Sequence, residues 1–154
     1  MQIDQIIIAA RDCIGTPFVP QGRLPGVGLD CAGLILHALQ AGGITIDDVA
    51  SYTIPPDPTL LIDALAQGGF MQQDQIMPGA VLLFRFQGRA QHLALAISDN
   101  TMIHAFAPAR HVVETDIGSA WRQRLLGSYY VTSLRSGTGV NEVGFKPRSQ
   151  LPVQ

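Results

Sequence analysis

The hydrophobic positions in the first third of the chain recur at helical spacing. The first such stretch ends at a Gly-Thr-Pro turn, and its apolar positions are Ile3, Ile6, Ile7, Ala10 and Ile14. Asp30 can cap a second helix, which stops at Gly42-Gly43. Residues 17–29 between them are rich in Gly and Pro, which predicts a loop. After an extended connection over 44–58, Asp57 and Pro58 form a typical cap and first-turn pair for a third helix through about Gln67.

After residue 79 the pattern changes to short apolar runs of strand length. These runs cover residues 80–86, 92–97 and 101–106, with weaker candidates at 112–115 and 129–132. Short turns between the runs predict antiparallel pairing. Helices followed by a meander of strands predict an α+β fold, with N-terminal helices packed on a central antiparallel β-sheet.

The alternation of side chains between the two faces of a strand predicts how two histidines lie relative to each other. His92, Ala94 and Ala96 share one face of their strand, because side chains alternate. A two-residue hairpin loop would put His104 on the opposite face. A three-residue loop, 98–100, pairs Ala94 with His104, and the histidines become diagonal neighbours about 7 Å apart. We expect this loop, with Asn100 in the left-handed conformation.

Composition limits the classes of function. The chain has 154 residues and a net charge of -2, without a basic stripe that could follow a nucleic-acid backbone. No apolar run is long enough to span a bilayer, and the N-terminal stretch lacks the basic region of a secretory signal. We therefore expect synthesis in the cytoplasm. Residues 1–135 are predicted to form one domain, and the polar, aperiodic residues 136–154 a flexible tail.

Cys31 directly follows the predicted cap Asp30, so it lies in the first turn of a helix. A helix N-terminus and a nearby imidazolium both favour a thiolate, which is the nucleophilic form of cysteine. With His92 as general base and His104 as its orienting partner, the pattern indicates a Cys-His hydrolase or acyl-transfer site. Considered alone, Cys31 could also be a small buried residue of the hydrophobic core, and each histidine could be an ordinary surface or core residue.

A metal site is the competing chemistry, since one cysteine and two histidines can bind zinc or copper. The chain has no Cys-x-x-Cys and no His-Glu-x-x-His motif, and Cys13 would have to join from another helix. We therefore expect neither a metal nor another cofactor. His37 and His111 are weaker candidates for the site, because His37 faces away from Cys31 on its helix and His111 begins a short strand.

Several motifs occur together in a specific order. They are Ile14-Gly-Thr-Pro-Phe18, Asp30-Cys31-Ala-Gly-Leu34, Pro78-Gly-Ala-Val-Leu-Leu-Phe84, Gln91-His92-Leu-Ala and Met102-Ile-His104-Ala. With this order the chain resembles the NlpC/P60 family of papain-like cysteine peptidases from its start to about residue 134. The Leu-Leu-Phe-Arg-Phe segment at 82–86 and Trp121-Arg-Gln-Arg-Leu125 look like the branch associated with phages and gene-transfer agents.

The resemblance implies that Cys31 is the nucleophile, His92 the base and His104 the third residue. It also implies cleavage of peptidoglycan stem peptides, commonly between γ-D-glutamate and the diamino acid, by a protein that accompanies phage-like tail proteins and acts on the cell wall. Asp30, and the positions of Phe18 and Ala32, are implied in substrate binding. The family usually has Tyr and Ser at these last two positions, and a lost donor to an oxyanion can cost about 3 kcal/mol.

Two further functions fit the same residues. A tail-tip assembly module could keep the fold with weak or no turnover, as the missing hydroxyls at Phe18 and Ala32 would allow. An acyltransferase or amidase could use the same three residues on a lipid or small-molecule amide, and an exposed apolar groove would favour it.

Overall fold

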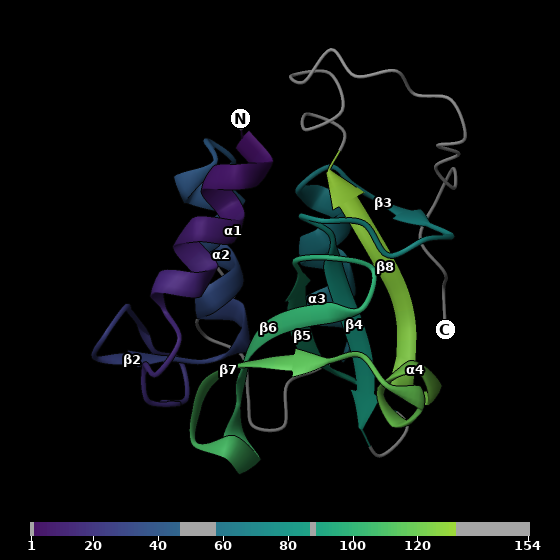
Figure 1. Cartoon of the computed structure of the whole chain (residues 1–154). Helices are drawn as coiled ribbons and strands as arrows, with labels where there is room; N and C mark the ends of the chain where they lie inside the picture. The colour runs from purple at the N-terminus through teal and green to yellow at the C-terminus, as the bar shows by residue number, and fades with distance from the viewer. Residues whose placement is uncertain (1, 47–57, 87–88, 132–154) are drawn as a thin grey trace.

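The computed structural model describes residues 2–46, 58–86 and 89–131 (Figure 1). The helices are α1 (Gln2–Asp12), α2 (Cys31–Ala41), α3 (Pro58–Gln67) and α4 (Ser119–Arg124), with a 3₁₀ turn η1 (Ala107–Ala109). The strands are β1 (Arg23–Leu24), β2 (Gly28–Leu29), β3 (Phe70–Gln73), β4 (Val81–Phe86), β5 (Arg89–Ala96), β6 (Thr101–Phe106), β7 (His111–Asp116) and β8 (Leu125–Val131).

Six strands form one antiparallel sheet in the order β3-β8-β4-β5-β6-β7. The helices α1 and α2 pack against each other beside this sheet, and α2 and α3 both contact β5 (Figure 1). The predicted α+β architecture, with N-terminal helices on an antiparallel sheet, is confirmed.

The structure adds short elements to the predicted ones. The Gly- and Pro-rich segment is not a plain loop, because β1 and β2 form a small antiparallel ladder within it. The strand β3 pairs with β8, and α4 precedes β8. Most of the predicted connection at 44–58, the cap at Asp57 and the tail at 136–154 lie outside the described residues.

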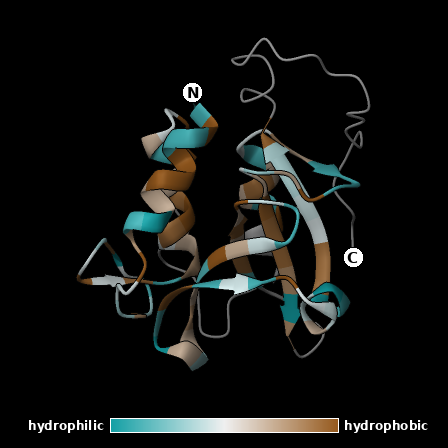
Figure 2. Cartoon of the chain, in the orientation of Figure 1, coloured by the Kyte–Doolittle hydropathy of each residue, from teal (hydrophilic) through white to brown (hydrophobic). Residues whose placement is uncertain are grey.

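The core lies around β4, β5 and β6. Each of Leu82, Ala94, Ala96 and Met102 is fully buried. Figure 2 shows the hydrophobic residues concentrated on α1, α2 and the central strands, whereas α4 is largely hydrophilic. Burial on this scale, at about 25 cal/mol per Å² of apolar surface, is what holds the helices on the sheet.

The β5–β6 hairpin has the expected register. Leu95 pairs with Ile103 and Ala96 with Met102, which leaves a three-residue loop at 98–100 and places Ala94 opposite His104. The left-handed conformation expected for Asn100 is wrong, because the described non-glycine residues with positive φ are Gln21 and Arg110. The Ser98 hydroxyl closes the loop instead, by accepting from the backbone N–H groups of Asn100 and Thr101 at 3.1 Å each.

The segment that follows α1 covers the free edge of β7. Gly15 donates to the carbonyl of Val112 at 2.9 Å, and Phe18 donates to that of Arg110 at 2.8 Å. This pairing ties the Gly-Thr-Pro-Phe motif to the sheet and protects its edge from other strands. Among the described helices, none is long and apolar enough to cross a membrane.

Candidate active site

Cys31 is the first residue of α2, and close backbone packing holds that end of the helix. A Cβ atom on Gly33 would lie 2.2 Å from the carbonyl oxygen of Gly22, a distance that no side chain tolerates. The absence of a side chain at Gly33 therefore lets the loop that leads into β1 rest directly on the first turn of α2. The Cys31 side chain is half-buried.

Asp30 is the N-cap of α2, and its carboxylate is fully engaged. One oxygen accepts from the Gly33 N–H and from Arg23 Nη1, both at 2.8 Å, and the other accepts from the Gln21 N–H at 2.7 Å. The Asp30 side chain is 3% exposed. The structure therefore shows Asp30 as the cap of α2, and its implied contact with substrate stays a prediction.

The buried Arg23–Asp30 pair should contribute far more to stability than the surface pair Arg11–Glu114. Arg23→Gln leaves the buried carboxylate without its cation, and we expect it to lower the free energy of unfolding by about 3 kcal/mol. Arg11→Gln removes a similar contact at 3.1 Å whose partners are 52% and 35% exposed, and should cost less than about 1 kcal/mol. Urea unfolding of both variants measures the difference, and equal costs would contradict this assignment.

His92 and His104 form a chain of hydrogen bonds that ends at Thr115. His92 Nε2 lies 2.7 Å from His104 Nδ1, and His104 Nε2 lies 2.9 Å from Thr115 Oγ1. Either direction of donation satisfies the chain, and in one of the two assignments His92 Nε2–H donates to His104 Nδ1 and His104 Nε2–H donates to Thr115. This assignment leaves His92 Nδ1 unprotonated, which is the state a general base needs. Thr115, on β7, was not identified from the sequence.

The Cys31 thiol contacts the backbone of β5 at Leu93. A backbone hydrogen bond from Leu93, the residue after His92, lowers the pKa of the Cys31 thiol. The candidate residues come from the first turn of α2, the middle of β5 and the middle of β6. The structure places His92 and His104 in contact and Cys31 against the backbone of Leu93, and the catalytic roles of all three stay predictions.

Aromatic rings surround the two imidazoles. These rings belong to Phe84, Phe86, Phe106 and Trp121. Phe106 stacks on His104 with centroids 4.9 Å apart, and Trp121 approaches the same ring edge-on at 5.1 Å. His92 is 6% exposed and His104 is fully buried.

Burial determines the charge of the two imidazoles. It lowers the pKa of His92 to about 3, with a further contribution from His104, and lowers the pKa of His104 to about 4. Both rings are therefore neutral at physiological pH, as the tautomer assignment above requires.

The folded protein should be sensitive to acid for the same reason. In the unfolded chain both imidazoles bind protons below about pH 6.5, whereas in the folded protein they stay neutral to about pH 4, so acid favours unfolding. Stability should fall as the pH drops from 6.5 toward 4, by up to about 1.4 kcal/mol per pH unit for each histidine. Urea unfolding at several pH values tests this, and His104→Gln should show a shallower pH dependence. A slope identical to that of the unmodified protein would contradict it.

Burial opposes the thiolate that the helix N-terminus favours at Cys31. The pKa of the Cys31 thiol is raised to about 11, chiefly by burial and then by the Asp30 carboxylate, while hydrogen bonds from Leu93 and Ala32, together with Arg23, lower it only in part. At neutral pH Cys31 is therefore a neutral thiol and His92 a neutral imidazole. The Cys31 proton must therefore pass to His92 as the sulfur attacks the substrate. In this buried setting the thiolate and the imidazolium are stable only as an ion pair.

The remaining candidates occupy supporting positions. Phe18 is half-buried against the core and Ala32 is buried, so their implied contacts with substrate stay predictions. Cys13 is a free thiol that is 1% exposed. His111 begins β7 and is exposed. Within the described parts of the chain, no group of three His, Cys, Asp or Glu side chains is arranged to hold a metal ion.

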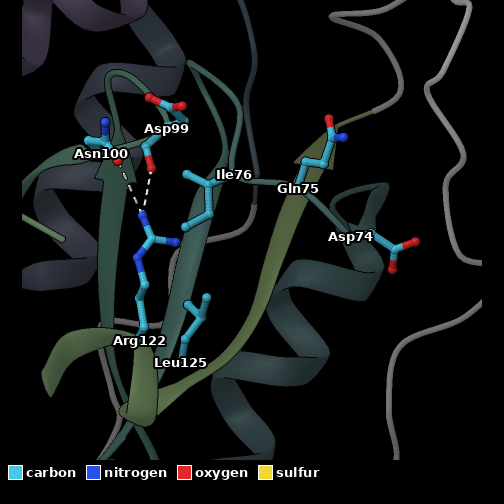
Figure 3. A pocket seen from close by; sticks show the side chains of 7 residues that line it. All are labelled: Asp74, Gln75, Ile76, Asp99, Asn100, Arg122 and Leu125. Carbon is cyan, nitrogen blue, oxygen red and sulfur yellow. Dashed lines mark hydrogen bonds between the residues drawn. The ribbon is translucent and has the colours of Figure 1, made fainter. Parts of the chain in front are cut away.

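A cavity of about 500 Å³ lies beside α4 and apart from this site. It is lined by Asp74, Gln75, Ile76, Asp99, Asn100, Arg122 and Leu125 (Figure 3). None of the three predicted catalytic residues lines it, so it is not the reaction centre.

The chain is similar in sequence to proteins of a known family. The model of the NlpC/P60 family matches residues 15–130. Probable endopeptidases of Mycobacterium tuberculosis and Mycobacterium bovis are 32% identical over 101 residues, which is 65% of this chain and 22% of theirs. Protein P54 of Enterococcus faecium is 29% identical over 108 residues, or 70% of this chain and 19% of that protein. The chain thus spans about a fifth of the length of these relatives.

Solved structures share the fold. The NlpC/p60 domain of the peptidoglycan hydrolase SagA has a TM-score of 0.59 and 25% identity, covering 84% of this chain and 98% of that one. A lipoprotein-like NLP/P60 protein from Staphylococcus aureus has a TM-score of 0.65 at 20% identity, covering 84% of this chain and 41% of that one.

Proposed function

Because this chain belongs to the NlpC/P60 family, whose members include peptidoglycan hydrolases and endopeptidases, we propose that it cleaves amide bonds in peptidoglycan stem peptides with Cys31 as nucleophile. The observation that carries the proposal is the relay from His92 through His104 to Thr115, together with the hydrogen bond between the Cys31 thiol and the backbone of Leu93, the residue after His92. A relay of this kind can orient a base toward a nucleophile.

The reaction begins with a neutral pair. The Cys31 sulfur attacks the carbonyl carbon of the scissile amide while its proton passes to His92 Nδ1. The resulting oxyanion is held by backbone N–H groups in the first turn of α2 other than that of Gly33, which donates to Asp30. His92 then donates the proton to the departing nitrogen, so the C–N bond breaks, an amine leaves and a thioester remains on Cys31.

Water completes the cycle. His92, neutral again, takes a proton from water as the oxygen attacks the thioester carbonyl, and the proton passes to the Cys31 sulfur as the C–S bond breaks. The products are a carboxylic acid and the free enzyme. His104 keeps His92 in one tautomer and supports the transient imidazolium, and Thr115 does the same for His104.

A second part of the proposal concerns which amide bond is cleaved and where the protein acts. We infer cleavage between γ-D-glutamate and the diamino acid, by a protein that accompanies phage-like tail proteins and opens the cell wall. The resemblance of residues 82–86 and 121–125 to the branch associated with phages and gene-transfer agents supports this setting.

Digestion of purified muropeptides tests the proposal. The full chain should release products that carry a new amine on the diamino acid and a new carboxylate on glutamate, which mass spectrometry identifies. A folded protein that releases no amine from any muropeptide would contradict hydrolysis and favour the assembly module. Products cut at another amide would retain the mechanism and overturn the inferred bond.

A further inference from the structure

The short helix α4 rests against the catalytic histidines. Its Trp121 ring lies 5.1 Å from the His104 ring and 6.0 Å from the His92 ring, measured between centroids. The same indole contacts Phe84 at 5.0 Å and Phe106 at 5.2 Å. Trp121 is half-buried, whereas His92 and His104, whose rings it contacts, are buried, so the indole covers part of their surface.

Intrinsic helix stability does not explain why α4 takes this position. The helix has six residues, no side-chain cap and no buried residue. A helix this short is unstable by itself in water, so contacts elsewhere must hold it.

Arg122 supplies those contacts. Its Nε donates to the Ile117 carbonyl and its Nη2 to the Asp99 carbonyl, each at 3.0 Å, and the Ile117 N–H donates to the Asn100 carbonyl at 2.7 Å. Figure 3 shows the Arg122 guanidinium directed at Asp99 and Asn100. These residues form the loop that joins β5 to β6, the two strands that carry His92 and His104. The anchor therefore ties Trp121 to the same hairpin as the base and its partner.

We propose that Trp121 is a positioning residue: held by Arg122, it keeps His92 and His104 in the orientation that catalysis requires and shields them from water. The catalytic part of this inference rests on the proposed function, but the effect of Trp121 on the pKa values of the two histidines can be measured without a substrate. Burial is the leading cause of the low pKa of both imidazoles. Removing the indole should admit water and raise both pKa values toward 6.5.

Titration of the histidine side chains by NMR is the deciding experiment. In the unmodified protein His92 and His104 should remain neutral down to about pH 5. In Trp121→Ala their midpoints should move up by about one pH unit or more, whereas Trp121→Phe, which keeps a ring in place, should stay near the original. Gln123→Ala, on the exposed face of the same helix, is the matched control and should change nothing.

A second variant keeps the test sound if Trp121→Ala fails to fold. Arg122→Gln leaves the indole intact but removes the anchor, and its midpoints should shift in the same direction by a smaller amount. Unchanged midpoints in folded Trp121→Ala, or in folded Arg122→Gln when Trp121→Ala does not fold, would overturn the inference.

Kinetic measurements on muropeptides then test whether the change in the histidine pKa values affects catalysis. Trp121→Ala should lower kcat about 10- to 100-fold with KM little changed, and the acid limb of kcat/KM should move to higher pH. A rise in KM alone, with the pH profile preserved, would make Trp121 a substrate contact and overturn the positioning role. If the NMR shift occurs but the unmodified protein hydrolyses no muropeptide, the proposed function fails and the structural inference stands.

Discussion

Cys31→Ala should abolish hydrolysis while the protein still folds. The mechanism passes through a covalent bond to this sulfur, so its removal should reduce the rate by about 10⁴-fold or more, to the level that binding and backbone donors alone can supply. The side chain is half-buried, and losing one sulfur atom there should change the free energy of unfolding by less than about 1 kcal/mol. Product formation followed by mass spectrometry, together with urea unfolding, measures both quantities.

Cys13→Ala is the matched control, since it makes the same substitution at the other cysteine. Cys13 is 1% exposed in the core near the end of α1. Its loss should cost about 1 kcal/mol of stability and leave turnover unchanged. Full activity in folded Cys31→Ala, or equal loss of turnover in both variants, would rule out Cys31 as the nucleophile.

His92→Gln should have the second-largest effect. Glutamine retains a polar group that can pair with His104, but it cannot accept the thiol proton or return it to the leaving amine. We expect a loss of about 10³- to 10⁴-fold in kcat. His104→Gln should cost less, because His104 acts by holding His92 and does not exchange a proton with substrate.

His111→Gln provides the comparison for His92. His111 is exposed at the start of β7 and lies outside the relay, so this variant should retain full activity. If His92→Gln and His111→Gln showed the same activity, the relay would not be part of the mechanism.

The placement of the histidines could be predicted because it depends on local rules. Alternation along β5 and a loop of odd length are enough to put His92 and His104 on one face, and the observed pairing of Leu95 with Ile103 has this register. The position of Cys31 followed from the cap at Asp30, whose bond to Gly33 is a short-range feature of the sequence. Periodicity likewise identified the central strands and the three longer helices.

The surroundings of the site could not be predicted in the same way. Trp121 meets His92 across the fold, and no local pattern records such a contact. Thr115 completes the relay only because β7 pairs with β6. The raised pKa of the Cys31 thiol could not be predicted either, because burial outweighs the helix terminus and the nearby hydrogen bonds.

The rate at which iodoacetamide alkylates Cys31 tests the central claim most directly, because it needs no substrate. A thiol with its pKa raised to about 11 should react slowly at pH 7 unless a neighbouring base accepts its proton. If His92 is that base, His92→Gln should lower the rate of alkylation of Cys31 at pH 7 at least about 10-fold. Cys13, which is 1% exposed, should react slowly in both proteins. An alkylation rate at Cys31 that is the same with and without His92 would show that the two groups share no proton, and would contradict the account.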